Sequence, residues 1–128
     1  MTQVHVQEEN RPTILAVDDD PDIHRLWERY LSAEGCRFVA AGGGLQALEL
    51  VQQERPAAIV LDVTLPDIDG WQVLQALKSD VTTKDIPVVM CSGLEERGWS
   101  LAMGADGYMR KPVTRRVFRS ALERVGVI

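Results

Sequence analysis

Short apolar runs alternate with amphipathic segments along most of this chain. The runs are almost continuously apolar, which is typical of strands buried on both faces of a sheet. The segments between them repeat apolar residues at helical spacing. The pattern predicts strands at 14–17, 37–40, 58–61, 87–91 and 107–110. It predicts helices whose inward faces carry Ile23, Leu26, Trp27, Tyr30 and Leu31; Leu45, Leu48 and Val51; Val73, Leu74 and Leu77; and Val117, Phe118, Ala121, Leu122 and Val125.

A further, short helix is expected around Trp99, so that every predicted strand is followed by a helix. Glycine and proline mark the boundaries: Gly35 ends one helix, the Gly42–Gly44 run is a turn, and Pro56 follows another helix. Five strand–helix units predict an α/β protein with a parallel sheet covered on both faces. Because crossovers are right-handed, the expected fold is the flavodoxin-like, doubly wound (βα)5 arrangement with strand order 2-1-3-4-5.

Length and composition narrow the class of protein. With 128 residues, of which 45% are hydrophobic and 26% charged, the chain fits one globular domain. We expect a flexible extension at 1–12 and the domain at 13–128. The net charge of −5 gives no general attraction to nucleic acid or to anionic membranes. The polar start and the lack of a membrane-length apolar run favour a cytoplasmic protein, in which Cys36 and Cys91 are expected as reduced core thiols.

Polar residues stand where several predicted strands end. Asp18 and Asp19 follow the first strand, Asp62 the third, Ser92 the fourth and Lys111 the fifth. In a parallel sheet these carboxyl ends meet at one edge, so the five side chains are expected to share a crevice. Three close carboxylates repel one another unless a cation is bound. Mg²⁺ suits oxygen ligands and phosphate chemistry, and an aspartate at such a site can act as a nucleophile toward phosphorus.

Simpler interpretations exist for several of these residues. Acidic residues beside proline often cap helices, and Asp20 or Asp22 is expected to do so before the first helix. Asp67 and Asp69 fit a turn between Pro66 and Gly70 better than a metal site. Helix capping alone does not explain why acidic residues follow both the first and the third predicted strand.

Five motifs together resemble the response-regulator receiver domain of two-component phosphorelay systems, over about Thr13 to Val125. They occur in the family's order, each at the end of the expected element. The motifs are Val17-Asp18-Asp19, Leu61-Asp62, Leu65-Pro66-Asp67-Ile68-Asp69-Gly70, Pro87-Val88-Val89-Met90-Cys91-Ser92 and Gly104-Ala105-Asp106-Gly107-Tyr108-Met109-Arg110-Lys111-Pro112.

The resemblance implies a role for each residue of the acidic group. Asp62 corresponds to the family's phosphoacceptor, and it also binds Mg²⁺. Asp19 corresponds to a direct metal ligand and Asp18 to a ligand that acts through water. Thr64 would contribute its backbone carbonyl to the metal. Lys111 would neutralise phosphoryl oxygens.

The resemblance also implies a conformational output. Ser92 corresponds to the switch hydroxyl and Tyr108 to the aromatic residue that moves with it, while Pro112 is expected after a cis peptide bond. The phosphoryl group would come from a histidine kinase or a phosphotransfer protein, and the output partner or attached domain is unknown. The domain would be a regulatory switch and not an enzyme acting on other substrates. A phosphorylation-dependent dimer is possible within such a family.

One segment departs from the family pattern. From Gly93 to Lys111 the chain is roughly three residues shorter, so the fourth helix is expected to be short or displaced. Such shortening is similar to receivers of hybrid histidine kinases, and the chain could be a whole regulator or part of a longer protein.

Two other functions remain open. A phosphatase of the haloacid-dehalogenase type also uses an aspartate on a parallel sheet, but it would need a carboxylate where this chain has Thr64. A scaffold that never takes up phosphate would keep the fold without the chemistry. Magnesium binding and phosphoryl uptake separate these possibilities.

Overall fold

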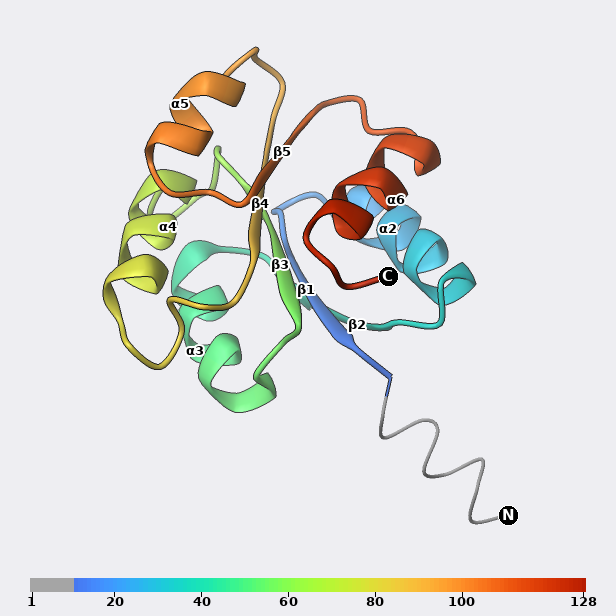
Figure 1. Ribbon diagram of the computed structural model, residues 1–128, viewed down its shortest axis with the longest axis horizontal. Coiled ribbons are helices and arrows are strands. Elements are labelled where there is room, and N and C mark those ends of the chain that lie inside the picture. Colours follow the sequence, from blue (N-terminus) through green and yellow to red (C-terminus); the bar gives the residue numbers. More distant parts are fainter. Residues whose placement is uncertain (1–10) are drawn as a thin grey trace.

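The computed structural model describes residues 11–128 and contains one five-stranded parallel sheet (Figure 1). The strands are β1 (Thr13–Val17), β2 (Arg37–Ala41), β3 (Ala58–Asp62), β4 (Val88–Ser92) and β5 (Gly107–Arg110). The helices are α2 (Pro21–Ala33), α3 (Gly44–Glu54), α4 (Gly70–Ser79), α5 (Arg97–Ala102) and α6 (Arg115–Arg124). The strand order is β2-β1-β3-β4-β5, which confirms the flavodoxin-like topology.

Helices cover both faces of the sheet. α2 and α6 lie together on one face, and α3, α4 and α5 lie on the other (Figure 1). Successive strand residues alternate between the two layers: Leu15 and Val17 pack beneath α3 and α4, whereas Ile14 and Ala16 face α2 and α6. Every residue of β1, β3 and β4 is buried, which explains why these strands are apolar at nearly every position.

The first helix begins and ends as the sequence predicts. Asp20 is the N-cap of α2, and its side chain accepts a hydrogen bond from the Asp22 backbone N–H. Pro21 occupies the first helical turn, where it needs no hydrogen-bond partner for a backbone N–H. Gly35 follows the C-cap with a φ of 74°, a left-handed conformation that favours glycine.

Two residues expected on buried helix faces lie at the surface. Leu45 is 60% exposed because the inward face of α3 is set by Gly44 and Ala47 instead. A Cβ atom at Gly44 would lie 2.6 Å from Ile68, so the helix approaches that loop closely and turns Leu45 outward. Val117 is 42% exposed, since α6 points Phe118 and Leu122 into the core.

Residues 1–10 lie outside the described part, so a flexible extension at 1–12 and a domain at 13–128 stay predictions. Within residues 11–128 no helix is long and apolar enough to cross a membrane. Cys36 and Cys91 are buried free thiols, as expected, and burial raises the pKa of Cys91 to about 12.

Candidate functional site

The parallel sheet brings the polar strand ends together at one edge. β1, β3, β4 and β5 are consecutive neighbours, so the residues at their carboxyl ends lie side by side. These ends carry Asp18, Asp62, Ser92 and Lys111, and Asp19 follows Asp18 directly. The convergence predicted from the sequence is therefore present, and it results from strand order and register.

Three carboxylates form the centre of the site. Asp18 and Asp62 are 1% and 6% exposed, whereas Asp19 is at the surface. One carboxylate oxygen of each residue lies within 4.8 Å of those of the other two. The buried pair sits at the bottom of the site, and Asp19 forms its solvent side. Oxygen donors at this spacing fit a hard divalent cation such as Mg²⁺.

Lys111 reaches the acidic group from β5. Its Nζ lies 2.7 Å from Asp18 Oδ2 and 3.2 Å from Asp62 Oδ2, so one ammonium bridges both buried carboxylates. Burial by itself would lower the pKa of Lys111, but the hydrogen bond to Asp18 and the charge of Asp62 outweigh burial and raise the pKa to about 12. The lysine is thus held in its charged form.

Asp62 experiences opposing influences. Burial raises the pKa of its carboxyl above the ordinary value, and the negative charge of Asp18 acts in the same direction. Lys111 opposes both effects. The backbone N–H of Thr64 lies 3.4 Å from Asp62 Oδ1, and Thr64 itself is exposed at the start of the following loop. A second positive charge at this position would favour the ionised carboxylate.

Asp67 and Asp69 hold the loop after β3 through hydrogen bonds to the backbone. This agrees with the prediction that they are turn residues and not metal ligands. Asp69 caps α4 in a capping box with Gln72. Asp67 reaches across to α3 and accepts hydrogen bonds from the Gly44 and Leu45 backbone N–H groups at 2.8 and 2.9 Å. The cap of α3 by a residue twenty-three positions away could not be found from sequence spacing.

Ser92 and Tyr108 are connected through the loop after β4. Both are buried. Ser92 Oγ accepts a hydrogen bond from the Leu94 backbone N–H at 3.1 Å. The Tyr108 hydroxyl donates to the Leu94 carbonyl and accepts from the Glu96 backbone N–H. Sequence reasoning identified the two side chains but missed the backbone of Leu94 and Glu96 that joins them, because a loop conformation leaves no periodic signal.

Two further expectations for this region are confirmed. The Lys111–Pro112 peptide bond is cis, and the Lys111 backbone N–H donates to the Ser92 carbonyl at 2.7 Å. α5 is a helix of only six residues, in agreement with the shortened segment before Lys111. Trp99 on α5 is exposed and packs edge-to-face on Trp71 of α4, with ring centroids 6.1 Å apart.

Comparison with known proteins gives one consistent result. The family model described as the response regulator receiver domain matches residues 14–123. A probable transcriptional regulator, ycf27, of Cyanophora paradoxa is 41% identical over 106 residues, which cover 80% of this chain and 43% of the relative. The response regulator MprA of Mycobacterium leprae is 41% identical over 102 residues, covering 77% and 44%.

Solved structures agree with the sequence relatives. The chemotaxis response regulator CheY4 of Vibrio cholerae superimposes with a TM-score of 0.84 at 28% identity, covering 91% of this chain and 99% of that one. A sensor protein from Polaromonas sp. JS666 gives 0.82 at 32% identity, covering 90% and 95%. The chain spans less than half the length of the curated relatives named above. By sequence, fold and the strand ends that form its site, the chain belongs to the family of response regulator receiver domains, the signalling domains of two-component systems.

Proposed function

We propose that this domain is a phosphoacceptor switch in which Asp62 takes a phosphoryl group from the phosphohistidine of a histidine kinase or phosphotransfer protein. The observation that carries the proposal is the Asp62 carboxylate, buried beside Asp18 and 3.2 Å from the Lys111 ammonium. A nucleophilic carboxylate, a fixed positive charge and adjoining oxygen donors are what phosphoryl transfer to aspartate requires.

The acidic group fits a magnesium ion. Asp19 and Asp62 would be direct ligands, Asp18 would bind through a water molecule, and Thr64 would offer its backbone carbonyl. When bound, Mg²⁺ supplies positive charge to the phosphoryl oxygens. The fit rests on the donor set, since three carboxylates at this spacing repel one another without a counter-charge beyond that of Lys111.

In the transfer, one Asp62 carboxylate oxygen attacks phosphorus. A P–O bond forms as the P–N bond to the donor histidine breaks, and the imidazole keeps the electron pair of that bond. Lys111 contacts both buried carboxylates, and its ammonium could move from one of them to a phosphoryl oxygen. Its positive charge could therefore stabilise the negative charge on the phosphoryl group throughout the transfer. No proton has to leave Asp62 if the carboxylate is ionised at the start.

The switch uses the connection through the loop after β4. A phosphoryl oxygen on Asp62 is an acceptor for the Ser92 hydroxyl, which now accepts from the Leu94 backbone. Movement of Ser92 would draw Leu94 with it and change the hydrogen bonds that hold Tyr108. The change is a shift in population between two packings of this segment.

We propose that this domain itself does not bind nucleic acid. With a net charge of −5, the domain has no general attraction for phosphate backbones. Relatives that are called transcriptional regulators are about twice as long as the part that matches. We also propose that the domain acts in the cytoplasm, and that it regulates a partner without being an enzyme for other substrates.

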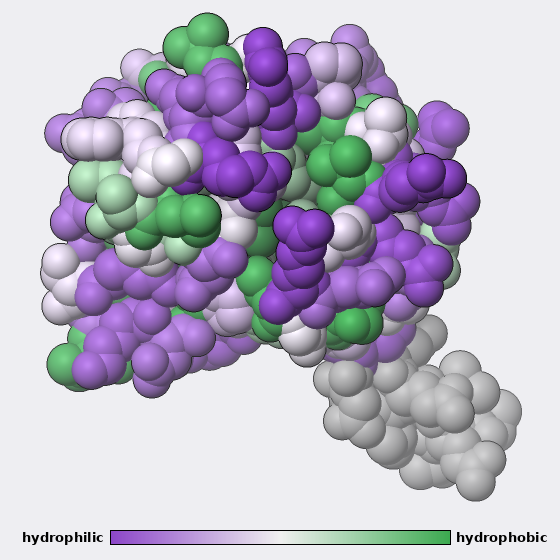
Figure 2. All heavy atoms as spheres, turned by 45° about the horizontal axis from the view of Figure 1, so that its top comes forward, coloured by the Kyte–Doolittle hydropathy of each residue, from purple (hydrophilic) through white to green (hydrophobic). Residues whose placement is uncertain are grey.

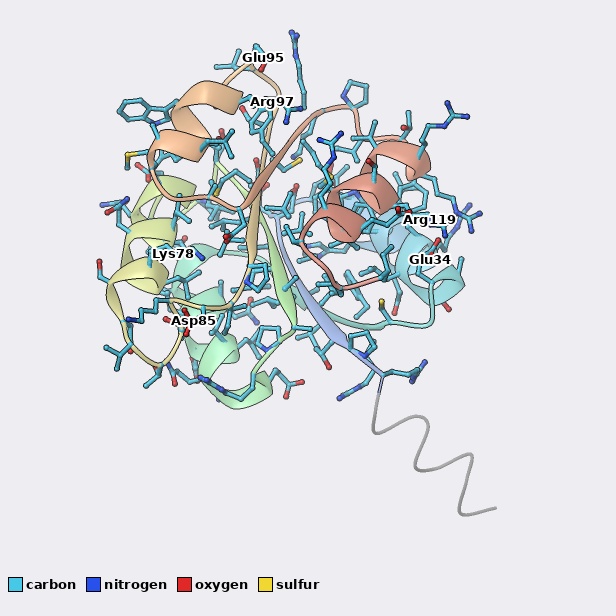
Figure 3. The ribbon with its side chains drawn as sticks, viewed as in Figure 1. Glu34, Lys78, Asp85, Glu95, Arg97 and Arg119 are labelled. Carbon is cyan, nitrogen blue, oxygen red and sulfur yellow. The ribbon has the colours of Figure 1, made fainter. Side chains whose placement is uncertain are left out.

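Intact-protein mass after incubation with acetyl phosphate and Mg²⁺ tests this function. We expect a gain of one phosphoryl group, lost with EDTA and in Asp62→Asn, and kept in Asp85→Asn, which changes an exposed aspartate away from the site (Figure 3). Failure to gain mass while Mg²⁺ still binds would indicate a scaffold that does not use its acceptor. Failure of both would exclude the phosphoacceptor function.

A further inference from the structure

One side of α4 contacts α5 and the turn that follows α5. Three contacts join Trp71 to Trp99, Gln75 to Met103 and Lys78 to Asp106. In both segments the three residues follow one another at intervals of four and three, which is the spacing of one helix face. We call Trp71, Gln75 and Lys78 the stripe of α4. The stripe holds α5 in one register beside α4, and the two helices lie next to each other in Figure 1.

The contact at Lys78 is the most firmly held of the three. Lys78 Nζ lies 2.8 Å from Asp106 Oδ2, and it also donates to the carbonyls of Lys84 and Ile86 at 3.1 and 3.0 Å (Figure 3). The same Asp106 oxygen accepts from the Val88 backbone N–H at 2.8 Å. Only 19% of the Lys78 side chain is exposed. Movement at this end would break several hydrogen bonds that involve a charged group, and these are the stronger kind.

The contacts become weaker toward the start of α5. Gln75 Nε2 makes one neutral hydrogen bond to the Met103 carbonyl, at 3.2 Å and at the surface. Trp71 and Trp99 meet edge-to-face at an angle of 86°, and Trp99 is 57% exposed. Figure 2, which brings the top of Figure 1 forward, shows pale and green residues gathered on the left, the side of α4 and α5. The tryptophan contact therefore lies at the surface, where little else has to move when it opens.

α4 itself is fixed to the strand that carries Asp62. The helix begins at Gly70, whose backbone N–H donates to the Val63 carbonyl at 2.8 Å. A Cβ atom at Gly70 would overlap the Asp62 carbonyl oxygen, so the start of the helix lies directly against that backbone. α4 cannot follow a movement of α5 without disturbing β3. A displacement of α5 must therefore open contacts of the stripe.

We propose that the contact between Trp71 and Trp99 is a clasp that holds α5 in the packing seen here, and that α5 pivots about the Lys78–Asp106 pair when the clasp opens. The role of the clasp in switching rests on the proposed function. A contact made in one of two packings stabilises that packing by the free energy of the contact. The clasp therefore opposes the change that a phosphoryl group on Asp62 brings about, and it sets how completely the domain switches.

A double-mutant cycle in urea denaturation tests whether the two rings stabilise each other. It compares Trp71→Leu, Trp99→Leu and the double variant with the unsubstituted chain. We expect a coupling of about fivefold in the unfolding equilibrium constant, because edge-to-face aromatic pairs contribute beyond the area they bury. The control cycle pairs Trp71→Leu with Leu101→Ala, a change at a residue of α5 that is 49% exposed and lies outside the stripe. No coupling between the tryptophans, or equal coupling in the control, would overturn the clasp.

Titration of the ¹⁵N-labelled full chain with beryllofluoride and Mg²⁺ tests the opposition to switching. Beryllofluoride is a stable mimic of a phosphoryl group on a carboxylate. Trp99→Leu should bind it up to about fivefold more tightly, since the free energy of the clasp no longer favours the unswitched packing. Leu101→Ala should bind it as the unsubstituted chain does. Unchanged or weaker binding in Trp99→Leu would contradict the role of the clasp in switching.

The same spectra test the pivot. Val88 and Asp106 exchange hydrogen bonds at the Lys78 end, because the Val88 N–H binds Asp106 Oδ2 and the Asp106 N–H binds the Val88 carbonyl at 2.8 Å. We expect beryllofluoride to shift the indole N–H signal of Trp99 strongly and these two backbone amide signals little. Shifts of Val88 and Asp106 as large as that of Trp99 would mean that α5 moves as a whole, and the pivot would be wrong.

Mass after acetyl phosphate treatment is measured on the same samples, so that the clasp and the proposed function can fail separately. Coupling between the tryptophans without phosphoryl uptake would keep the contact and overturn the function, together with the role of the clasp in switching. Phosphoryl uptake without coupling would keep the function and overturn the clasp. Coupling, uptake and tighter binding of beryllofluoride by Trp99→Leu would support both.

Discussion

Two segments of this molecule follow strands that end in site residues, yet they are held very differently. Residues 63–70 follow Asp62 and lead into α4, whereas residues 93–106 follow Ser92 and contain α5. Both begin at the same edge of the sheet, and the strands β3 and β4 that precede them are fully buried.

The segment after Asp62 is anchored at almost every step. The Gly70 backbone N–H donates to the Val63 carbonyl at 2.8 Å. Asp67 holds the start of α3, and Asp69 caps α4 in a reciprocal pair with Gln72. The loop that follows the Asp62 carboxylate is therefore firmly held.

In the segment after Ser92 the helix itself is less well satisfied. α5 has six residues and no side-chain cap. Glu96 Oε2 and Ser100 Oγ are buried without a hydrogen-bond partner within residues 11–128. Leu94 and Trp99 are exposed. Because α5 has no side-chain cap and leaves polar groups unsatisfied, we expect a second packing of this segment to cost less free energy than one of the segment after Asp62.

The largest effect is expected from a pair of helical glycines. A Cβ atom at Gly70 would lie 2.3 Å from the Asp62 carbonyl oxygen, so Gly70→Ala must displace backbone, and we expect unfolding free energy to fall by about 3 kcal/mol. Nothing lies within 4 Å of a Cβ atom at Gly98 in α5, and Gly98→Ala should add about 0.5–1 kcal/mol. Urea denaturation measures both. Equal effects would mean that the two segments are held alike.

The hydrogen bonds accepted by Asp67 should make the stability of the protein depend on pH. Backbone hydrogen bonds from Leu45, Gly44 and Ile68 lower the pKa of Asp67 to about 2, below the value of about 3.9 for an unfolded aspartate. Its contribution to stability is therefore present above about pH 4 and is lost as pH falls through about 2. Asp67→Ala should lower the Tm by a few degrees at pH 7, and the difference from the unsubstituted protein should shrink between pH 4 and 2.

Asp85→Ala is the control for that experiment. Asp85 is exposed, and its side chain accepts no hydrogen bond within the described residues, so its removal should change the Tm less at pH 7. A Tm difference for Asp67→Ala that stays constant down to pH 2 would contradict the role of the ionised carboxylate.

A smaller loss is expected at the cap of α4. Asp69→Ala removes the oxygen that accepts from the Gln72 backbone N–H, at a cost of about 1 kcal/mol in unfolding free energy. Asp69→Ser keeps an oxygen acceptor at the N-cap and should lie close to the unsubstituted protein. Urea midpoints of the two variants give the comparison. If serine and alanine destabilise equally, the cap contributes little and this segment is less firmly anchored than its contacts indicate.

The sheet, its strand ends and the cap of α2 were predicted from the sequence more accurately than the packing of the helices and loops on one another. Strand order and the convergence of Asp18, Asp62, Ser92 and Lys111 follow from apolar periodicity and from the handedness of crossovers, which are local or general rules. An acidic N-cap of α2 was expected at Asp20 or Asp22, and the structure has it at Asp20. It could be expected because capping depends on neighbouring residues.

The wrong predictions, for Leu45 and Val117, depend on packing between distant segments. Leu45 turns outward because Gly44 packs closely on the loop after β3, and a single sequence does not show which loop meets which helix. Val117 lines a groove whose width depends on how far the short α5 lies from α6, and apolar spacing on α6 alone indicated burial. Helical periodicity gives a helix its apolar face but not the neighbours that will cover it.

The smallest effect is expected inside α5. Ser100 is fully buried in the layer next to β5, and its hydroxyl has no partner within the described residues. Ser100→Ala removes an unsatisfied polar group and introduces a better helix former, so it should stabilise the protein by about 0.5–1 kcal/mol in urea denaturation. It should also slow hydrogen exchange at the Met103 and Gly104 amides, which bond back into α5. Thr83→Ala is the matched control, because the buried Thr83 hydroxyl donates to the Leu77 carbonyl at 2.7 Å and its loss should destabilise. If Ser100→Ala lost as much stability as Thr83→Ala, the Ser100 hydroxyl would have to make a stabilising hydrogen bond. The polar groups of α5 would then be as well paired as those of the segment after Asp62, and the two segments would not differ in this respect.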